Sequence, residues 1–117
     1  MRALQGDPFQ AIADPSRREI LNLLSRNRQT INSLAENFDM SRPAVSKHVK
    51  ILTGAGFIGI DDVGRERYCY LRSDGFDALQ EWINYYQKFW NKKLDALEKF
   101  LADTHPQAKP SKKIRKK

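Results

Sequence analysis

The feature that most constrains this chain is a pair of helix patterns separated by a two-residue turn, within residues 30–54. Thr30 is a suitable N-cap for the first helix. Asp39-Met40 then predicts a tight turn, and Ser41 can cap a second helix with Pro43 in its first turn. Two helices joined in this way predict a helix-turn-helix. The apolar positions of the first helix are Ile31, Leu34, Ala35 and Phe38.

The second of these helices, over residues 41–54, has an apolar face and a basic face. Val45, Val49 and Leu52 follow the i, i+4, i+7 spacing of one buried face. Gly54 and Gly56 predict the end of the helix. Ala44 and Ile51 complete the apolar set, and the polar and basic side chains on the rest of the circumference are Arg42, Ser46, Lys47 and Lys50.

The residues after this helix predict a two-stranded hairpin. Phe57, Ile58 and Ile60 favour a first strand, and residues 61–64 form a turn-rich segment. The sequence RYCYL over residues 67–71 alternates and is rich in β-forming residues. A hairpin over residues 58–72 directly after a helix-turn-helix is a wing. The predicted fold class is therefore mainly α with a small β-hairpin wing, a winged helix-turn-helix.

Two further helices are expected before this motif. Residues 8–13 favour a short helix that the Asp14-Pro15 step ends. Asp14 can cap the next helix, in which Pro15 suits the first position. The apolar face of that helix consists of Ile20, Leu21, Leu23 and Leu24.

A long C-terminal helix is predicted from Gly75 to about Asp103, because no proline interrupts an apolar pattern that repeats every three or four residues. Its aromatic surface exceeds what one buried face of a small domain can absorb. Such a helix covers its own core with one side and a partner with the other, so we predict a dimerisation helix and a homodimer. The predicted interface residues are Phe76, Leu79, Trp82, Ile83, Tyr86, Phe89, Trp90 and Leu97.

The positive charge of the chain is concentrated at its C-terminus. The 117 residues carry a net charge of +7, but six of these charges come from the tail KPSKKIRKK, so residues 1–108 carry 7 − 6 = +1. Nucleic-acid binding must therefore be argued from local patches. We predict a folded domain over residues 1–104 and a disordered basic tail over residues 105–117. The tail either solubilises the chain or makes non-specific phosphate contacts.

The remaining composition excludes several classes of protein. No apolar run approaches the ~18 residues of a membrane span, and the opening MRALQGDPF lacks the apolar region of a secretory signal. Cys69 is the single cysteine, which excludes an internal disulfide and fits the reducing cytoplasm. The chain has two distant histidines, no glycine-rich phosphate loop and no clustered metal ligands. We therefore expect a cytoplasmic protein that is not an enzyme.

Three stretches of the chain resemble the ArsR-type family of bacterial winged-helix repressors. They are ADPSRREILNLL (Ala13–Leu24), SLAENFDMSRPAVSKHVKILTGAGFI (Ser33–Ile58) and GRERYCYL (Gly64–Leu71). The resemblance implies a homodimer that binds double-stranded DNA at an imperfect palindromic operator and blocks transcription. Some members lack an effector site and act simply as autorepressors or respond to a partner protein, and this chain fits that group.

In that family the helix equivalent to residues 41–54 enters the major groove, and the turn of the wing approaches phosphates or the minor groove. Arg42 lies in the first turn, where a guanidinium can read guanine, whereas Lys50 is expected to contact phosphate. His48 can bond either the DNA backbone or its own core. The predicted DNA-binding residues are Ser41, Arg42, Pro43, Ser46, Lys47, His48, Lys50, Arg65 and Arg67.

The metal ligands of the family are missing from this sequence. Many members bind metal through cysteines in an ELCVCDL-like stretch, but RQTINSL here places Thr30 and Asn32 at those positions. The long helix offers no histidine, and His105 lies at its fraying end. The carboxylates on that helix are Asp74, Asp77, Glu81, Asp95 and Glu98. We therefore expect no metal and no cofactor.

Three alternatives stay open at this point. Cys69 can act as a thiol redox sensor beside Arg67, or it can be an inert thiol that is buried or half-buried. The winged helix can serve protein contacts instead of DNA, which would require apolar residues exposed on the helix over 41–54. The aromatic segment Trp82–Trp90 can also receive a partner protein or an apolar effector.

Overall fold

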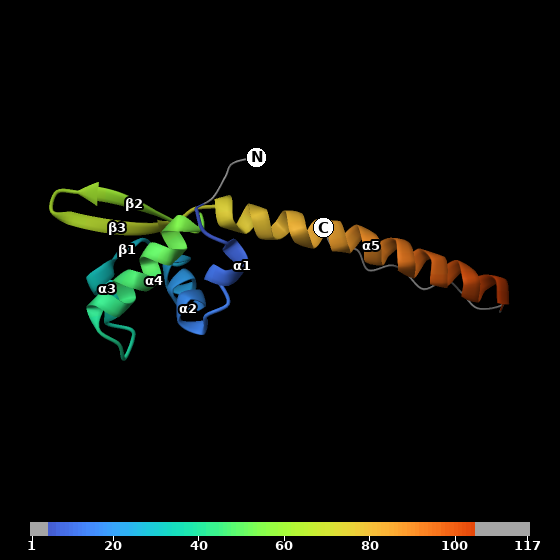
Figure 1. Ribbon diagram of the computed structural model, residues 1–117, viewed down its shortest axis with the longest axis horizontal. Coiled ribbons are helices and arrows are strands. Elements are labelled where there is room, and N and C mark those ends of the chain that lie inside the picture. The colour runs from blue at the N-terminus through green and yellow to red at the C-terminus, as the bar shows by residue number, and fades with distance from the viewer. Residues whose placement is uncertain (1–4, 105–117) are drawn as a thin grey trace. The chain divides into compact units, whose positions relative to one another are not determined.

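The computed structural model describes residues 5–104 and confirms the predicted fold class (Figure 1). The predicted tail, residues 105–117, lies outside the described residues. The chain divides into two compact units, one ending at Gln80 and the other beginning at Glu81. Its helices are α1 (Pro8–Ala11), α2 (Pro15–Leu24), α3 (Ile31–Ala35), α4 (Arg42–Gly54) and α5 (Asp74–Thr104), and its strands are β1 (Gln29–Thr30), β2 (Ile58–Val63) and β3 (Glu66–Leu71).

Three helices of the first unit begin where the sequence predicts, because each start is fixed by a local hydrogen bond. The N-cap side chain accepts a bond from the backbone N–H three residues further on, at 3.0 Å for Asp14, 3.1 Å for Thr30 and 3.3 Å for Ser41. The bond from the Arg17 N–H also holds the pKa of Asp14 below its ordinary value.

The end of α4 depends on Gly56. Gly54, predicted to share in stopping the helix, is its last residue, whereas Gly56 has a φ of 85°. The Gly56 N–H donates to the Thr53 carbonyl at 3.1 Å, and the Phe57 N–H donates to the Leu52 carbonyl at 3.0 Å. These two bonds form a Schellman motif, in which a left-handed glycine reverses the chain. The motif directs the chain from α4 into β2.

The two strands of the hairpin are longer than predicted, although the hairpin as a whole keeps close to its predicted bounds. Residues 61–64 were expected to form the turn, but β2 continues to Val63, which pairs with Glu66. Only Gly64 and Arg65 connect the strands, and the φ of 62° at Gly64 suits the first position of a type II′ turn. The tight turn lets both strands extend by the residues that the sequence analysis assigned to a loop.

A third strand was not predicted. The short strand β1 pairs with β3, so the sheet has the order β1-β3-β2 and is antiparallel throughout. Gln29 lies opposite Cys69, and Thr30 lies opposite Tyr68. Helix α3 ends at Ala35, earlier than predicted, and Phe38 packs against the core from the following turn. Two-residue pairing of this kind carries no periodic signal in the sequence.

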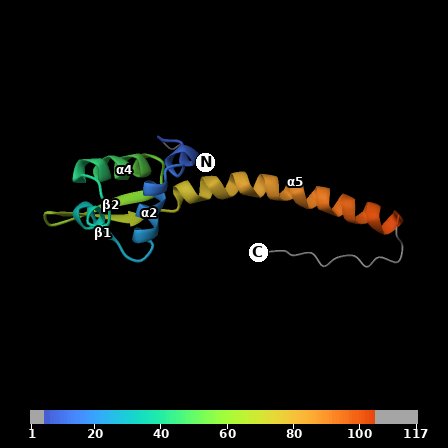
Figure 2. The ribbon, with the colours of Figure 1, turned by 90° about the horizontal axis from the view of Figure 1, so that it is seen from below.

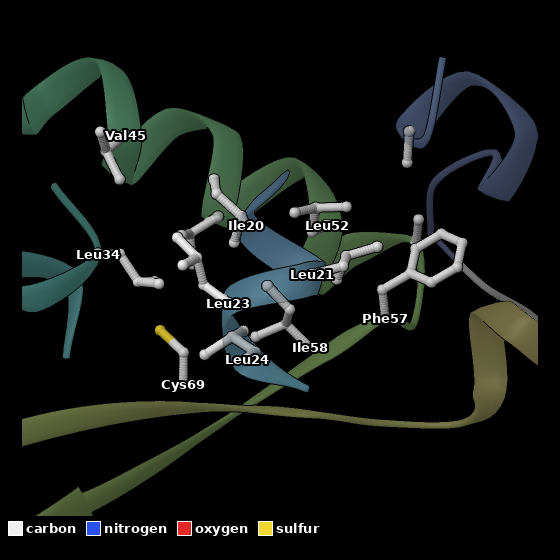
Figure 3. Packing of buried hydrophobic residues seen from close by; sticks show 13 residues of the cluster. Ile20, Leu21, Leu23, Leu24, Leu34, Val45, Leu52, Phe57, Ile58 and Cys69 are labelled. Atoms are coloured by element: carbon white, nitrogen blue, oxygen red, sulfur yellow. The ribbon is translucent and has the colours of Figure 1, made fainter. Parts of the chain in front are cut away.

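The core of the first unit lies between α4 and the hairpin, with α2 passing between them (Figures 2 and 3). Val45 and Leu52 point from α4 toward Ile58 and Cys69 of the strands, and Leu34 closes one end (Figure 3). These side chains are almost completely buried. The core therefore fixes α4 relative to the hairpin. None of the helices within residues 5–104 has the length and apolar character that a bilayer span requires.

Replacing Gly75 by alanine is expected to lower the free energy of unfolding by about 1–3 kcal/mol. A Cβ atom there would lie 2.8 Å from the Ala55 carbonyl oxygen and 2.8 Å from ring carbons of Phe57. Gly54→Ala is the matched control, because a Cβ atom at Gly54 meets nothing within 4 Å. Urea denaturation of both variants checks this prediction. Equal stability of the two would contradict close packing of the start of α5 on Phe57.

Candidate nucleic-acid interface

Helix α4 presents a basic side away from the core. Successive residues turn by about 100° around an α-helix, which places Pro43, Lys47 and Lys50 opposite the buried face. All three are exposed, and α4 contains no acidic residue. Ile51, expected in the apolar set, is 42% exposed and joins Pro43 as an apolar side chain on this side. The outward side of α4 therefore carries the charges of Lys47 and Lys50 with no acidic residue, which argues against a purely apolar docking face.

The first turn of α4 is connected to α3 by side chains. Ser41 caps the helix, and the exposed Arg42 donates a hydrogen bond from Nε to Oδ1 of Asn32. Asn32 lies in the first turn of α3, ten residues earlier in the sequence. The guanidinium of Arg42 is therefore oriented by a neighbouring helix, although it is exposed.

A groove of about 690 Å³ runs between α4 and the hairpin. It brings together three of the predicted residues, Ser46 and Lys50 from α4 and Arg67 from β3. Val49 and Ile60 give it an apolar floor next to the core. The other lining residues are Gln5, Ile31, Thr53, Gly54, Gly56, Arg72 and Asp74. This groove joins the basic side of α4 to the wing in one surface.

The two arginines predicted on the wing have different surroundings. Arg65 lies in the hairpin turn and is exposed. Arg67 faces the same side of the sheet as the core residues of β3, and its Nε lies 2.9 Å from Oδ1 of Asp62. Both side chains of this pair are about two-thirds exposed, so the ion pair contributes little to stability and can exchange for a phosphate.

Arg28 contacts the side of the hairpin opposite to Arg67. Its Nη1 donates to Oδ2 of Asp61 at 2.7 Å, and its guanidinium lies 4.6 Å from the centroid of the Tyr68 ring. Arg28 immediately precedes β1, so it ties the short strand to the hairpin. This contact helps to hold the wing in place against the domain.

His48 contacts α2. Its Nδ1 lies 3.3 Å from Nη1 of Arg17. The Nε of the same arginine donates to the Ala11 carbonyl at 2.6 Å, and its Nη2 donates to the Gln10 carbonyl at 3.2 Å. A guanidinium can only donate, so Nδ1 accepts and a neutral His48 carries its proton on Nε2. His48 is half-buried, in agreement with the core alternative. Its predicted DNA contact stays a prediction.

Cys69 is fully buried between β3 and the core. Burial raises the pKa of its thiol, and the nearby Arg67 only partly opposes this effect. A reactive sensor cysteine needs an accessible thiolate. The structure therefore contradicts the redox alternative, and Cys69 is a core residue.

The predicted dimer residues fall into two groups, those before Gln80 in the first unit and those after it in the second unit. Leu79 is half-buried against the core of its own chain, and the Phe76 ring packs edge-on against Phe57 with centroids 4.8 Å apart. Residues 81–104 carry ten large exposed apolar side chains, 42–65% exposed, which we call the α5 apolar strip. At 100° per residue they occupy about half of the helix circumference. They are Trp82, Ile83, Tyr85, Tyr86, Phe89, Trp90, Leu94, Leu97, Phe100 and Leu101.

Within residues 5–104 no group of three histidine, cysteine, aspartate or glutamate side chains gathers as a metal site would require. The two residues at the family's cysteine positions have other contacts. Thr30 caps α3, and Asn32 accepts the hydrogen bond from Arg42. Neither side chain offers the thiolate that soft metals prefer.

Sequence reasoning missed two residues that contact the predicted interface, Asn32 and Arg17. Each reaches α4 through a hydrogen bond to a residue distant in sequence, ten positions away for Asn32 and 31 for Arg17. Helical periodicity places both on their own helices but carries no information about such partners. The polar character of Asn32, at an exposed helix position facing no predicted core, was the one available signal.

Comparisons with known proteins agree on one family. The sequence model for "Bacterial regulatory protein, arsR family" matches residues 14–59. The transcriptional repressor SdpR of Bacillus subtilis (strain 168) is 39% identical over 84 residues, which cover 72% of this chain and 90% of that repressor. The HTH-type transcriptional regulator Rv2034 of Mycobacterium tuberculosis is 34% identical over 86 residues, which cover 74% and 78%. A crystal structure of an ArsR family transcriptional regulator has a TM-score of 0.68 and 39% identity, covering 73% of this chain and 93% of that one.

Proposed function

Because the chain belongs to the ArsR family and is a DNA-binding transcriptional regulator, we propose that it is a homodimeric repressor of an imperfect palindromic operator. In this proposal α4 enters the major groove, and the wing reaches the adjacent backbone or minor groove. The observation that carries it is the basic outward side of α4, a helix without acidic residues, together with the groove in which Lys50 of α4 and Arg67 of the wing line one hollow.

In this proposal the N-terminal part of α4 makes the contacts to bases. The major groove admits an α-helix and displays a distinct edge for each base pair. Ser41, Arg42, Pro43 and Lys47 are exposed on the first two turns. Arg42 is the reader that we assign to guanine, because its planar guanidinium can donate two parallel hydrogen bonds to O6 and N7.

In this proposal residues of the groove and of the wing make the contacts to phosphates. A DNA strand that passes from the major groove to the minor groove runs between a recognition helix and its wing, where Ser46, Lys50 and Arg67 line one hollow. Phosphate contacts fix the register of the protein without reading sequence. Arg65 at the hairpin turn extends this surface outward. His48 Nε2–H supplies a further donor in the same helix.

In this proposal the α5 apolar strip forms the dimer interface. Large aromatic side chains present roughly 200 Å² each, so the six aromatic side chains of the strip, about half exposed, offer on the order of 600 Å² per chain, and the four aliphatic side chains add to this area. Solvent-exposed patches on monomers are smaller, and about 800 Å² per partner suffices for a stable interface. A two-fold dimer presents two copies of α4, which matches a palindrome with half-sites one helical turn apart or a multiple of it.

The mode of regulation follows from this assembly. A dimer bound across its operator excludes other proteins from that DNA, which gives repression, and an operator in its own promoter gives autorepression. In this proposal the protein binds its operator in the cytoplasm and needs no metal or cofactor to do so. A partner protein or an apolar effector that engages the α5 apolar strip would relieve repression by competing with the dimer contact.

Nuclease footprinting across the region upstream of the gene tests this function. We expect one protected segment with two-fold symmetry. A dimer that contacts about 6–10 phosphates should lose roughly 10³–10⁵-fold in affinity between 50 and 200 mM salt. Lys47→Gln with Lys50→Gln should weaken protection far more than the charge-matched pair Lys88→Gln with Lys99→Gln, which lies on α5. Absence of protection in every fragment would defeat the proposal.

A further inference from the structure

The hydrogen bond between Asn32 and Arg42 joins the two helices of the helix-turn-helix at the point where α4 would meet bases. Asn32 Oδ1 must be the acceptor, because a guanidinium has five N–H donors and no acceptor. Helix α3 holds Asn32 in place, since Thr30 caps its start and the neighbouring Ile31 packs against the core. A fixed group of α3 therefore occupies the Nε–H of Arg42.

Occupation of Nε restricts how Arg42 can read a base. A guanidinium offers two bidentate edges, one formed by Nε and one Nη, the other formed by both Nη atoms. With Nε–H donated to Asn32, the edge formed by Nη1 and Nη2 is left for O6 and N7 of guanine. The bond also limits the orientations that the guanidinium can adopt.

The contact is too exposed to serve mainly as a stabilising bond. Both side chains are exposed, and exposed polar pairs contribute little to folding stability. A long arginine side chain, however, loses substantial rotamer freedom when it binds in one geometry. A partner that already holds the side chain in that geometry removes part of this cost from the binding step.

We propose that Asn32 is a positioning residue for sequence recognition, which holds Arg42 in the end-on geometry that reads guanine. This inference rests on the proposed function. It assigns to α3 a part in base discrimination that neither the composition nor the periodicity of the chain indicates. Asn32 itself need not touch DNA.

A double-mutant cycle on operator binding tests the proposal. Affinities are measured for the protected operator and for variants at each base pair, with the unchanged protein, Asn32→Ala, Arg42→Ala and the double variant. Asn32→Ala is expected to reduce discrimination about threefold to tenfold at the base pair that Arg42 reads, and nowhere else. In the Arg42→Ala background Asn32→Ala should change nothing, because the residue to be positioned is absent.

Two further variants separate positioning from general effects. Asn32→Asp keeps an acceptor for Nε, so it should preserve the base preference while its negative charge weakens binding to all sequences alike. Asn22→Ala removes a similar exposed hydrogen bond, at 3.3 Å to Glu19 on α2, and should leave the base preference unchanged. Melting temperatures within about 2 °C of one another would exclude unfolding as a cause.

The outcomes distinguish this inference from the function on which it rests. If the unchanged protein binds no operator, the proposed function fails. If the protein binds and Arg42→Ala removes a base preference while Asn32→Ala leaves it intact, the positioning role alone is overturned. Additive effects in the cycle, or loss of preference in Asn32→Asp, would likewise overturn it, because Asn32 would then act on DNA independently of Arg42.

Discussion

Arg42→Ala is expected to cost about 1–3 kcal/mol of discrimination at one base pair in each half-site, which is roughly 5-fold to 150-fold in relative affinity. Alanine keeps the helix but removes the bidentate donor, so the base at that position is no longer distinguished. The expected loss occurs twice in a two-fold dimer. Because Arg42 is exposed and on the first turn of α4, the substitution leaves the core intact.

Lys50→Ala provides the contrast. Lys50 lines the groove between α4 and the hairpin, where we place a phosphate. A lysine contacts phosphate as a point charge and carries no sequence information. Its removal should weaken all sequences by the same factor and reduce the slope of log affinity against log salt by about one per contact.

Measurement of both variants against a complete set of single-base operator variants checks this division of labour. Arg42→Ala should make the affinities for the four bases equal at one operator position. Lys50→Ala should lower the affinity for every operator variant by the same factor. Identical profiles for the two variants would refute the assignment of base reading to the start of α4 and of phosphate contact to the groove.

The parts of the fold that sequence predicts well are those fixed locally. Asp14, Thr30 and Ser41 each cap a helix through a bond within three residues, so the signal and its effect lie in the same short segment. The buried face of α4 is also read correctly, because Val45, Val49 and Leu52 repeat at the helical period. These features set the order of elements and the side of α4 that faces outward.

The features that were missed depend on partners distant in sequence. Strand β1 exists because residues 29–30 meet β3, and two residues are too few for an alternating pattern. The acidic residues 61–62 look like a loop, yet Asp61 pairs with Arg28 and Asp62 with Arg67 on opposite sides of a strand. In both cases pairing with a neighbouring strand determined the backbone conformation more strongly than the local sequence propensity did.

The same limit applied to the candidate site. Sequence reasoning placed the basic side chains on α4, because their helix positions follow from spacing alone. It gave no access to the orientation of the Arg42 guanidinium or to the contact of His48 with Arg17, since both bonds cross between helices. The mouth of the groove also depends on how the hairpin lies against α4, which only the packed core determines.

Trp90→Glu combined with Leu97→Glu is expected to abolish the dimer and to lower operator affinity by at least about a hundredfold. Both residues lie near the middle of the α5 apolar strip, 55% and 52% exposed in the single chain, and a two-fold contact would bring four new carboxylates into the interface. Burying unpaired charges costs several kcal/mol each. Separate protomers would bind half-sites independently and lose the high effective concentration that a linked second half-site gives.

Sedimentation and operator titration, with a single half-site as a second DNA ligand, separate assembly from DNA contact. The double variant should sediment as a monomer and bind one half-site about as well as the charge-matched variant Lys88→Gln with Lys99→Gln, whose positions lie on the polar side of the helix. That control should stay dimeric and keep its operator affinity within a fewfold range. A double variant that stays dimeric and binds the operator normally would show that the α5 apolar strip is not the dimer contact. Since the strip occupies half of the helix circumference over residues 82–101, its exposure would then have to be explained by a different partner.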